Sequence, residues 1–338
     1  MPGLPSLRRI AGAVRLLVVG GAGYIGSVTV EHLLAGGHDV TVLDNFSTGH
    51  PYAVPPGAST VYADLADTTR LGEVFREGRF EAVLHFAARS IVPESMTAPG
   101  SYFANNVATV VGLLNTMLAR GVNKFVFSSS ASVYGSPEVV PIPETAPLRP
   151  NNPYGASKAM VEQMLAWYSA GTALKYASLR YFNAAGASEQ FGEDHRPETH
   201  LIPIAIEAAM GRRPEVEIYG TDYPTPDGTP VRDYIHVLDL AEAHARALEQ
   251  LNGESIVCNL GTEAGYSVRE VVETVGRVTG SAVPVRLGPR RPGDAPATVA
   301  RVRRAREVLG WGATRGLAEM VESAWRWWLN HPRGYEGN

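Results

Sequence analysis

The sequence predicts an α/β protein with a doubly wound parallel sheet and a smaller, interleaved substrate domain in the C-terminal half. Four short apolar segments in the first half have the length and β-branched composition of buried strands: 14–19, 39–43, 82–86 and 124–128. Three longer segments carry helical periodicity: 24–35, 102–120 and 154–170. Strands that alternate with helices form parallel sheets covered on both faces.

The second half is less regular and indicates a domain boundary. Helical patterns recur there between loops rich in proline and glycine: 201–211, 237–251, 268–279 and 317–329. The segment 236–260 has strand and helix character like the first half, so we expect it to return to the first domain. The predicted division has three parts. Residues 1–13 form a loose N-terminal extension, residues 14–183 with the returning segment 236–260 form the first domain, and residues 184–235 with 261–338 form the second domain.

Composition excludes several classes of partner. The chain has 338 residues and a net charge of −4, with both signs spread along it, so we expect no nucleic-acid or membrane partner. The longest apolar stretch, 16–26, is too short to span a bilayer. A single cysteine, Cys258, excludes a disulfide framework and fits a reducing compartment, so the predicted location is cytoplasmic. No metal site is expected.

A glycine-rich turn follows the first predicted strand and opens the first predicted helix. Residues 20–26 read GGAGYIG, so Gly20, Gly23 and Gly26 have the spacing G-x-x-G-x-x-G. Glycines here let the backbone approach a pyrophosphate, which the free N–H groups of the helix start then bind. Asp44 ends the second strand, where a dinucleotide-binding (Rossmann) fold has the acid for the adenosine ribose. Because a carboxylate there repels a 2′-phosphate, the predicted cofactor is NAD.

Tyr154 and Lys158 begin the helix predicted after Pro153. Residues four apart project from one face of a helix. A tyrosine pKa near 10 is too high for a base at neutral pH, and a nearby ammonium lowers that pKa by stabilising the phenolate. Taken alone, a Y-x-x-x-K pair is common by chance and indicates only an amphipathic surface.

Hydroxyl residues at the end of the strand 124–128 strengthen the catalytic interpretation. Residues 127–135 read FSSSASVYG. The carboxyl end of such a strand lies over the nicotinamide site of a doubly wound sheet. Ser130 can therefore hydrogen-bond the substrate hydroxyl whose proton Tyr154 removes. Ser128 is expected only to cap the strand or the turn that follows it.

Several motifs occur in a fixed order along the chain. They are GxxGxxG at 20–26, HFAA at 85–88, NNV at 105–107, SSSASVYG at 128–135, NPYGASK at 152–158, RYFN at 180–183, VRDYIHV at 231–237 and PRRPGD at 289–294. In this combination the chain resembles the extended short-chain dehydrogenase/reductase family, and within it the enzymes that epimerise nucleotide sugars at C4. The resemblance extends from about Val14 to Trp327.

The resemblance implies a role for each matching residue. Tyr154 would be the base and acid, Lys158 its electrostatic partner and Ser130 the hydroxyl that orients the substrate. Besides the three glycines, the residues that would line NAD are Tyr24, Ile25, Asp44, Asn45, Phe46, Ser47, Thr48, Gly49, Asp64, Leu65, Phe86, Ala87, Ala88, Arg89, Ser90, Asn105, Ser130, Tyr154, Lys158 and Phe182. Those that would hold the nucleotide sugar are Ser130, Tyr154, Asn183, His200, Leu201, Tyr219, Arg232, Arg291, Asp294 and Thr298.

The implied reaction is the reversible inversion of C4 of a UDP-hexose, UDP-glucose or UDP-galactose, through a transient 4-keto intermediate with bound NAD. A hydride leaves C4 for NAD while Tyr154 takes the hydroxyl proton, and it returns to the other face after the sugar has turned. In the family, a bulky residue at the position of Thr298 restricts the hexose pocket. The threonine therefore extends the expected substrates to UDP-GlcNAc and UDP-GalNAc.

Other functions of the same fold remain alternatives. A sugar 4,6-dehydratase is disfavoured, because the family then has an Asp-Glu pair where this chain has Ala131 and Ser132. A UDP-uronate 4-epimerase, or another NAD-dependent enzyme that modifies nucleotide sugars, stays open, although residues 181–183 match the neutral-sugar pattern better. A non-enzymatic NAD-binding regulatory protein is disfavoured because Tyr154 and Lys158 are both present.

The resemblance also implies a homodimer, in which the helices 102–120 and 154–170 of two chains form a four-helix contact. Both helices carry apolar residues around more of their circumference than one core-facing stripe needs: Val110, Leu113, Leu114, Met117, Met160, Met164 and Trp167. A fully buried helix would give the same pattern.

Overall fold

Seven parallel strands form the main sheet of the computed structural model, in the order β11-β6-β5-β4-β1-β2-β3. The model describes residues 12–291 and 293–337, so most of the extension predicted at 1–13 lies outside the described residues. The strands are β1 (Arg15–Val19), β2 (Asp39–Asp44), β3 (Ser59–Tyr62), β4 (Ala82–His85), β5 (Lys124–Ser130), β6 (Lys175–Tyr181) and β11 (Ile256–Leu260). The order reverses between β1 and β4, and sheets of this kind bind ligands beyond the carboxyl ends of the strands at that point.

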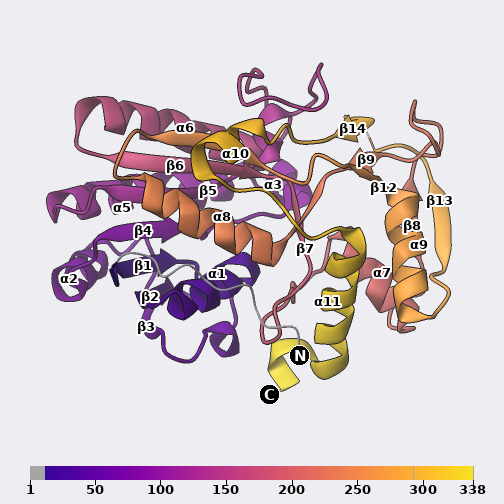
Figure 1. Cartoon of the computed structure of the whole chain (residues 1–338), viewed down its shortest axis with the longest axis horizontal. Coiled ribbons are helices and arrows are strands. Elements are labelled where there is room, and N and C mark those ends of the chain that lie inside the picture. Colours follow the sequence, from indigo (N-terminus) through magenta and orange to yellow (C-terminus); the bar gives the residue numbers. More distant parts are fainter. Residues whose placement is uncertain (1–11, 292, 338) are drawn as a thin grey trace.

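Helices cover both faces of the sheet, which confirms the predicted doubly wound α/β class (Figure 1). They are α1 (Tyr24–Ala35), α2 (Thr68–Gly78), α3 (Val92–Thr97), α4 (Pro99–Phe103), α5 (Thr109–Ala119), α6 (Pro153–Gly171), α8 (Val237–Gln250) and α10 (Arg303–Leu309). Alternate residues of β1 point to opposite faces of the sheet and pack in two different cores. Leu16 and Val18 pack in the core with α1 and α8, whereas Leu17 and Val19 pack with α2, α5 and α6.

The remaining elements form a second part with its own core, at the right of Figure 1. They are β7 (Asn183–Ala185), α7 (Leu201–Ala209), β8 (Val216–Tyr219), β9 (Val231–Arg232), β10 (Tyr234–His236), β12 (Tyr266–Ser267), α9 (Val268–Thr279), β13 (Val285–Gly288), β14 (Ala297–Thr298) and α11 (Leu317–Asn330). Ile206 of α7, Val271 and Val275 of α9, and Met320 of α11 are completely buried in this core. The apolar stripes of the three helices therefore close on one another.

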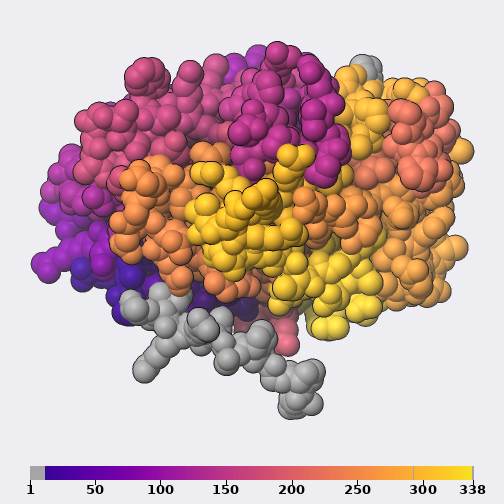
Figure 2. Space-filling model, turned by 45° about the horizontal axis from the view of Figure 1, so that its top comes forward, coloured from indigo at the N-terminus to yellow at the C-terminus, as the bar shows by residue number. Residues whose placement is uncertain are grey.

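The chain passes between the two parts more than once. After β10, α8 packs against α1, and β11 pairs with β6 at the edge of the main sheet. This placement supports the predicted return of residues 236–260, while the division into domains as a whole stays a prediction. A segment that follows β5 also lies beside the C-terminal part (Figure 2), where Ile142 forms a bridge with Ala300. None of the helices in the described part of the chain is long and apolar enough to cross a membrane.

The helix predicted at 102–120 differs from the structure in its interior. α4 ends at Phe103, a π-helical turn covers Ala104–Ala108, and α5 begins at Thr109. Four residues of α5 on which the dimer prediction depended are completely buried within the same chain: Val110, Leu113, Leu114 and Met117. They belong to the core because α5 packs closely on the sheet and on α2. This part of the argument for a dimer was wrong.

Candidate active site

The glycine turn between β1 and α1 is packed so closely that only glycine fits at two of its positions. Gly20 has φ +80°, and a Cβ there would lie 2.4 Å from the backbone nitrogen of Ala87. A Cβ at Gly26 would lie 2.2 Å from the carbonyl oxygen of Gly20. A Cβ at Gly23 would lie 3.5 Å from its nearest neighbour, the carbonyl oxygen of Gly20, so packing does not require glycine there. This side of the turn is open to a ligand. The turn thus has the shape of a pyrophosphate cradle.

The carboxylate of Asp44 is fixed against this turn. It accepts hydrogen bonds from the backbone N–H of Ala22 at 3.0 Å and of Phe46 at 2.8 Å, and the residue is only 8% exposed. Burial raises the pKa of Asp44, while these backbone hydrogen bonds lower it. Beside it, Asn45 donates from Nδ2 to Asp64 at 2.7 Å. The predicted cofactor residues at the ends of β2 and β3 therefore form one polar edge.

The loop after β4 brings the next predicted cofactor residues to the same edge of the sheet. The backbone N–H groups of Phe86 and Ala87 both donate to the carbonyl of Val19, at the end of β1. Asn106, which was not among the predicted residues, holds the loop further on. It accepts from the N–H of Arg89 at 2.8 Å and donates to Ser157 Oγ of α6 at 3.1 Å. Asn106 is 3% exposed, whereas the predicted Asn105 only donates to it.

Ser130, Tyr154 and Lys158 come together where β5 ends and α6 begins. Asn152 caps α6 by accepting from the N–H of Gly155 at 2.8 Å, and Pro153 occupies the first turn, so the helix begins at a fixed point. The ammonium of Lys158 lies 5.8 Å from the centroid of the Tyr154 ring and donates to the carbonyl of Ser128 at 2.8 Å. Ser130 hydrogen-bonds the hydroxyl of Tyr154. The spacing of the pair on the helix thus places both side chains over the strand end.

Burial shifts the pKa of both Tyr154 and Lys158 toward the neutral form. Burial raises the pKa of Tyr154, and the hydrogen bond from Ser130 lowers it only in part. Burial also lowers the pKa of Lys158 to about 7, against the opposing effect of Glu162. The ammonium form of Lys158, beside the Tyr154 ring, stays the predicted source of a lower tyrosine pKa. The positive nicotinamide ring remains the other source of the predicted lowering.

A buried ion pair supports the strand end from behind and was not predicted. Arg180 of β6 donates from Nε to both carboxylate oxygens of Glu162 at 3.0 Å, and both side chains are 6% exposed. Ser129 of β5 donates to the same carboxylate at 2.5 Å. Glu162 lies one helical turn after Lys158, and this spacing was the available signal. The pair joins α6, β5 and β6 where the catalytic residues emerge.

Five of the residues predicted to hold the nucleotide sugar form a cluster in the second part. The guanidinium of Arg291 lies 3.9 Å from the centroid of the Tyr219 ring, and Arg232 forms an ion pair with Asp294. Thr298 is paired in register with Arg232. Such arginines match the geometry of a diphosphate.

Near this cluster are two residues that were not predicted. Arg290 lies 4.3 Å from the centroid of the Tyr223 ring, and the buried hydroxyl of Tyr223 has no hydrogen-bond partner. Neither could be chosen from sequence, because the loop of Tyr223 has no periodicity that would indicate which side chains turn inward.

The other predicted residues of the nucleotide-sugar set, apart from the catalytic group, lie in β7 and at the start of α7. Asn183 donates from Nδ2 to the carbonyl of Asp233 at 2.7 Å, next to Phe182, which was predicted for the cofactor and is 7% exposed. Leu201 begins α7, directly after His200. The imidazole of His200 contacts the carboxylates of Glu193 and Glu198.

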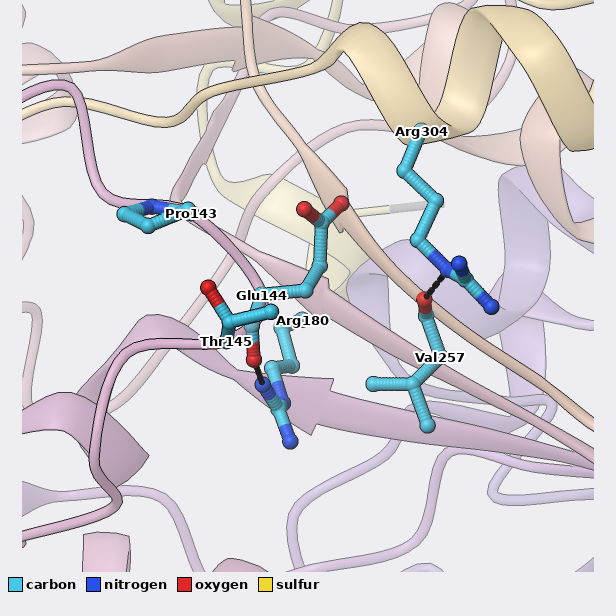
Figure 3. A pocket seen from close by; sticks show the side chains of 6 residues that line it. All are labelled: Pro143, Glu144, Thr145, Arg180, Val257 and Arg304. Carbon is cyan, nitrogen blue, oxygen red and sulfur yellow. Dashed lines mark hydrogen bonds between the residues drawn. The ribbon is translucent and has the colours of Figure 1, made fainter.

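A hollow of about 440 Å³ lies apart from these residues (Figure 3). The hollow is lined by Pro143, Glu144, Thr145, Arg180, Val257 and Arg304. None of these was predicted as a site residue. Both of its arginines donate to carbonyls, Arg180 to Glu144 at 3.0 Å and Arg304 to Val257 at 2.8 Å. We therefore assign the candidate active site to the strand ends and not to this hollow.

Comparison with known proteins gives a consistent result over nearly the whole chain. Residues 16–261 match the model of the NAD dependent epimerase/dehydratase family. The chain is 50% identical to a UDP-glucose 4-epimerase of Streptomyces lividans over 95% of this chain and 98% of the relative. A crystal structure of UDP-glucose 4-epimerase from Brucella ovis in complex with NAD is 46% identical, with a TM-score of 0.90 over 93% of this chain and 98% of that one. A structure from Bifidobacterium longum in complex with NAD+ and UDP is 38% identical, with a TM-score of 0.90 over 94% and 99% of the two chains.

Proposed function

The chain belongs to the NAD dependent epimerase/dehydratase family, and within it to the UDP-glucose 4-epimerases, and we propose that Ser130, Tyr154 and Lys158 carry its chemistry. It is an NAD-dependent enzyme that reversibly inverts C4 of a UDP-hexose. The observation that supports the residue assignment is the convergence of these three side chains beside the glycine turn at the switch point of the sheet.

The proposed proton transfers follow from the positions of these groups. NAD, when bound, accepts a hydride from C4 and returns it to the opposite face of the 4-keto sugar. Tyr154 removes the proton of the C4 hydroxyl and later restores it, while Ser130 orients that hydroxyl. Lys158 supplies positive charge that stabilises the phenolate. General acid–base catalysis of this kind contributes roughly 10² to 10⁴ in rate.

Anchoring of the nucleotide is proposed for the cluster in the second part. Arg232 and Arg291 would pair with the diphosphate, and Asp294 and Tyr219 hold their guanidinium groups in place. Firm binding of the nucleotide lets the hexose turn without leaving the site. The neutral-sugar reaction is favoured over a uronate 4-epimerase and over a regulatory protein without activity.

We extend the proposal to substrate range, quaternary structure and location. Thr298, a small residue, leaves room for an acetamido group at C2, so UDP-GlcNAc and UDP-GalNAc are proposed as further substrates. A homodimer is proposed on α5 and α6, where Met160 and Trp167 of α6 are 46% and 74% exposed. A cytoplasmic location is proposed from the single, buried Cys258.

A product assay tests the function directly. Purified protein is mixed with UDP-galactose and the nucleotide sugars are separated; we expect UDP-glucose, without added cofactor, because the cycle regenerates NAD. Denatured protein should release NAD into the supernatant. Formation of a dehydrated or decarboxylated product, or a requirement for NADP, would contradict the assignment.

The same assay with UDP-GalNAc tests the role of Thr298. We expect the wild type to convert both sugars, and Thr298→Tyr to lower kcat/KM for UDP-GalNAc much more than for UDP-galactose. An unchanged ratio of the two kcat/KM values would show that another side chain limits the pocket.

A further inference from the structure

Two histidines and two glutamates converge in the loop between β7 and α7. Glu193, His195, Glu198 and His200 each direct one possible ligand atom to a common point, and these atoms all lie within 4.8 Å of one another. Nδ1 of His200 is 2.8 Å from Oε1 of Glu193, and Nδ1 of His195 is 3.1 Å from the same oxygen. Nδ1 of His195 is also 3.8 Å from Oε2 of Glu198.

These spacings are close to those of a tetrahedral metal site. With metal–ligand bonds of about 2.0–2.2 Å, tetrahedral ligand atoms are roughly 3.3–3.5 Å apart. The distances in the cluster lie on both sides of that value, so small side-chain shifts would bring the four atoms onto one cation. Two imidazole nitrogens with two carboxylate oxygens form a ligand set that suits Zn²⁺.

One unpartnered carboxylate oxygen in the cluster points to a ligand independently of the spacing. Oε2 of Glu198 is buried without a hydrogen-bond partner, although the side chain is only 5% exposed. Its other oxygen, Oε1, accepts from the backbone N–H of Thr199 at 2.6 Å and of His200 at 2.7 Å. The backbone therefore orients this carboxylate and leaves Oε2 free for a ligand. A buried polar atom in this state is expensive unless something binds it.

We propose that Glu193, His195, Glu198 and His200 bind one zinc ion that fixes the loop between β7 and α7. Four protein ligands leave no open position, so the ion is structural and not catalytic. The carboxylates are 7% and 5% exposed and the imidazoles 34% and 49%, so an ion can enter from the imidazole side. This inference does not depend on the proposed residue roles in catalysis.

The position of the site suggests what the ion stabilises. The ring of His195 packs edge-on against that of Tyr24 in the first turn of α1, with centroids 6.3 Å apart. His200 directly precedes Leu201, the first residue of α7. A zinc ion there would join the cofactor helix of the first part to α7 of the second part. No metal was expected from the sequence, and the spacing E-x-H-x-x-E-x-H of residues 193–200 matches no recognised ligand motif.

The decisive variant is Glu198→Gln. Glutamine keeps the carbonyl oxygen that accepts from Thr199 and His200 but replaces the free oxygen with an amide that cannot bind zinc. Glu189→Gln is the matched control, since it makes the same change at an exposed residue of the same loop. All chains are prepared without a histidine tag, stripped with a chelator and dialysed against Zn²⁺, and bound zinc is measured by mass spectrometry.

We expect one zinc per chain in the wild type and in Glu189→Gln, and at least a tenfold weaker affinity in Glu198→Gln. Co²⁺ in the wild type should give the visible absorption of a four-coordinate ion, and Zn²⁺ should raise the Tm of the wild type but not of Glu198→Gln. Circular dichroism and NAD content verify that the variant is folded. Absence of stoichiometric zinc in the wild type, or equal zinc in the two variants, would overturn the proposal and leave only a histidine–glutamate hydrogen-bond network.

Discussion

Tyr154 and Lys158 are both buried, and burial favours the neutral form of each. The pKa of the tyrosine is raised, and that of the lysine is lowered to about 7. An uncharged pair is stable in a dry site, but it is not the form that removes a proton. The reactive state therefore requires the positive charge of the cofactor and the hydroxyl of Ser130, so proton abstraction is coupled to cofactor binding.

Removal of the Tyr154 hydroxyl should stop proton transfer without disturbing the cofactor site. We expect Tyr154→Phe to lower kcat by about 10² to 10⁴, the usual contribution of a general acid–base group, with NAD retained. Turnover of UDP-galactose and NAD released on denaturation measure the two effects. Tyr168→Phe is the control, because Tyr168 is on the same helix and contacts only Asn115 through its hydroxyl. Activity close to wild type in Tyr154→Phe would refute the catalytic assignment.

Burial of Lys158 should also make stability depend on pH in a defined window. Its pKa falls from 10.5 to about 7 on folding, so between these values the unfolded chain binds a proton that the folded chain does not. Stability then rises with pH above about 7, by about 1.4 kcal/mol per unit, and this contribution is constant below it. In the NAD-free protein, we expect the free energy of unfolding to rise by about 2–3 kcal/mol more in the wild type than in Lys158→Met between pH 6 and pH 9.

Urea denaturation at the two pH values measures this difference. The control is Lys175→Met, whose side chain is 38% exposed and stays hydrated in the folded chain. A parallel pH dependence in the wild type and Lys158→Met would show that the amine of Lys158 titrates as it does in water.

Individual functional residues could be predicted where their role depends on local geometry. The glycine turn, Asp44 and the pair Tyr154/Lys158 each lie at a fixed distance from a strand end or along a helix, and such distances are visible in a sequence. Asn106 and Tyr223 acquire their contacts only through folding. Ser157, for example, lies 51 positions along the chain from Asn106. Sequence patterns hold no signal for such pairs.

At the level of elements, α6 is held to the sheet by a buried ion pair as well as by apolar packing. Arg180 and Glu162 are each 6% exposed, and Ser129 and Tyr134 complete their hydrogen bonds. Loss of one partner leaves a buried charge uncompensated, whereas replacement of both can be nearly neutral. The orientation of α6, and with it the position of Tyr154, depends on this pair.

Single and double substitutions should differ sharply here. We expect Arg180→Met to cost about 3–5 kcal/mol of unfolding free energy, and the double variant Glu162→Leu/Arg180→Met to recover most of it. Chemical denaturation of the single and double variants gives the coupling energy. Additive losses in the double variant would mean that the two side chains act independently, contrary to their geometry.

Elements were predicted correctly where apolar residues recur at a regular spacing. They were missed where apolar residues are mixed with charged and polar ones. α1 and α9 have the predicted bounds, because their apolar residues recur at helical spacing between clear ends. β6 was not predicted, since its sequence KYASLRY contains charged and polar residues. Among them, Arg180 is paired with Glu162 of α6 only after folding. The apolar pattern of α5 could not distinguish burial within the chain from an interface between chains.

At the scale of the whole molecule, an apolar stripe on α6 stays exposed. Met160, Met164 and Trp167 follow one another at spacings of four and three along α6, on the same side of the helix. Met160 and Trp167 are 46% and 74% exposed, while Met164 is half-buried. An exposed tryptophan of this kind is typical of the centre of a protein interface. With the buried residues of α5 removed from the argument, this stripe is what supports a homodimer.

A charge at the centre of the stripe should therefore dissociate the dimer. We expect the wild type to be a dimer at micromolar concentration and Trp167→Glu to be a monomer, because the interface would bury an unpaired carboxylate. Size-exclusion chromatography with light scattering gives the mass of each. Leu329→Glu is the matched control, since Leu329 is 55% exposed on α11, outside the proposed interface, and this variant should remain dimeric. The helical signal in circular dichroism and the NAD content should be the same in all three chains, because the side chains of Trp167 and Leu329 are exposed and belong to no hydrophobic core. A monomeric wild type would refute the homodimer, and dissociation by Leu329→Glu alone would place the interface on α11.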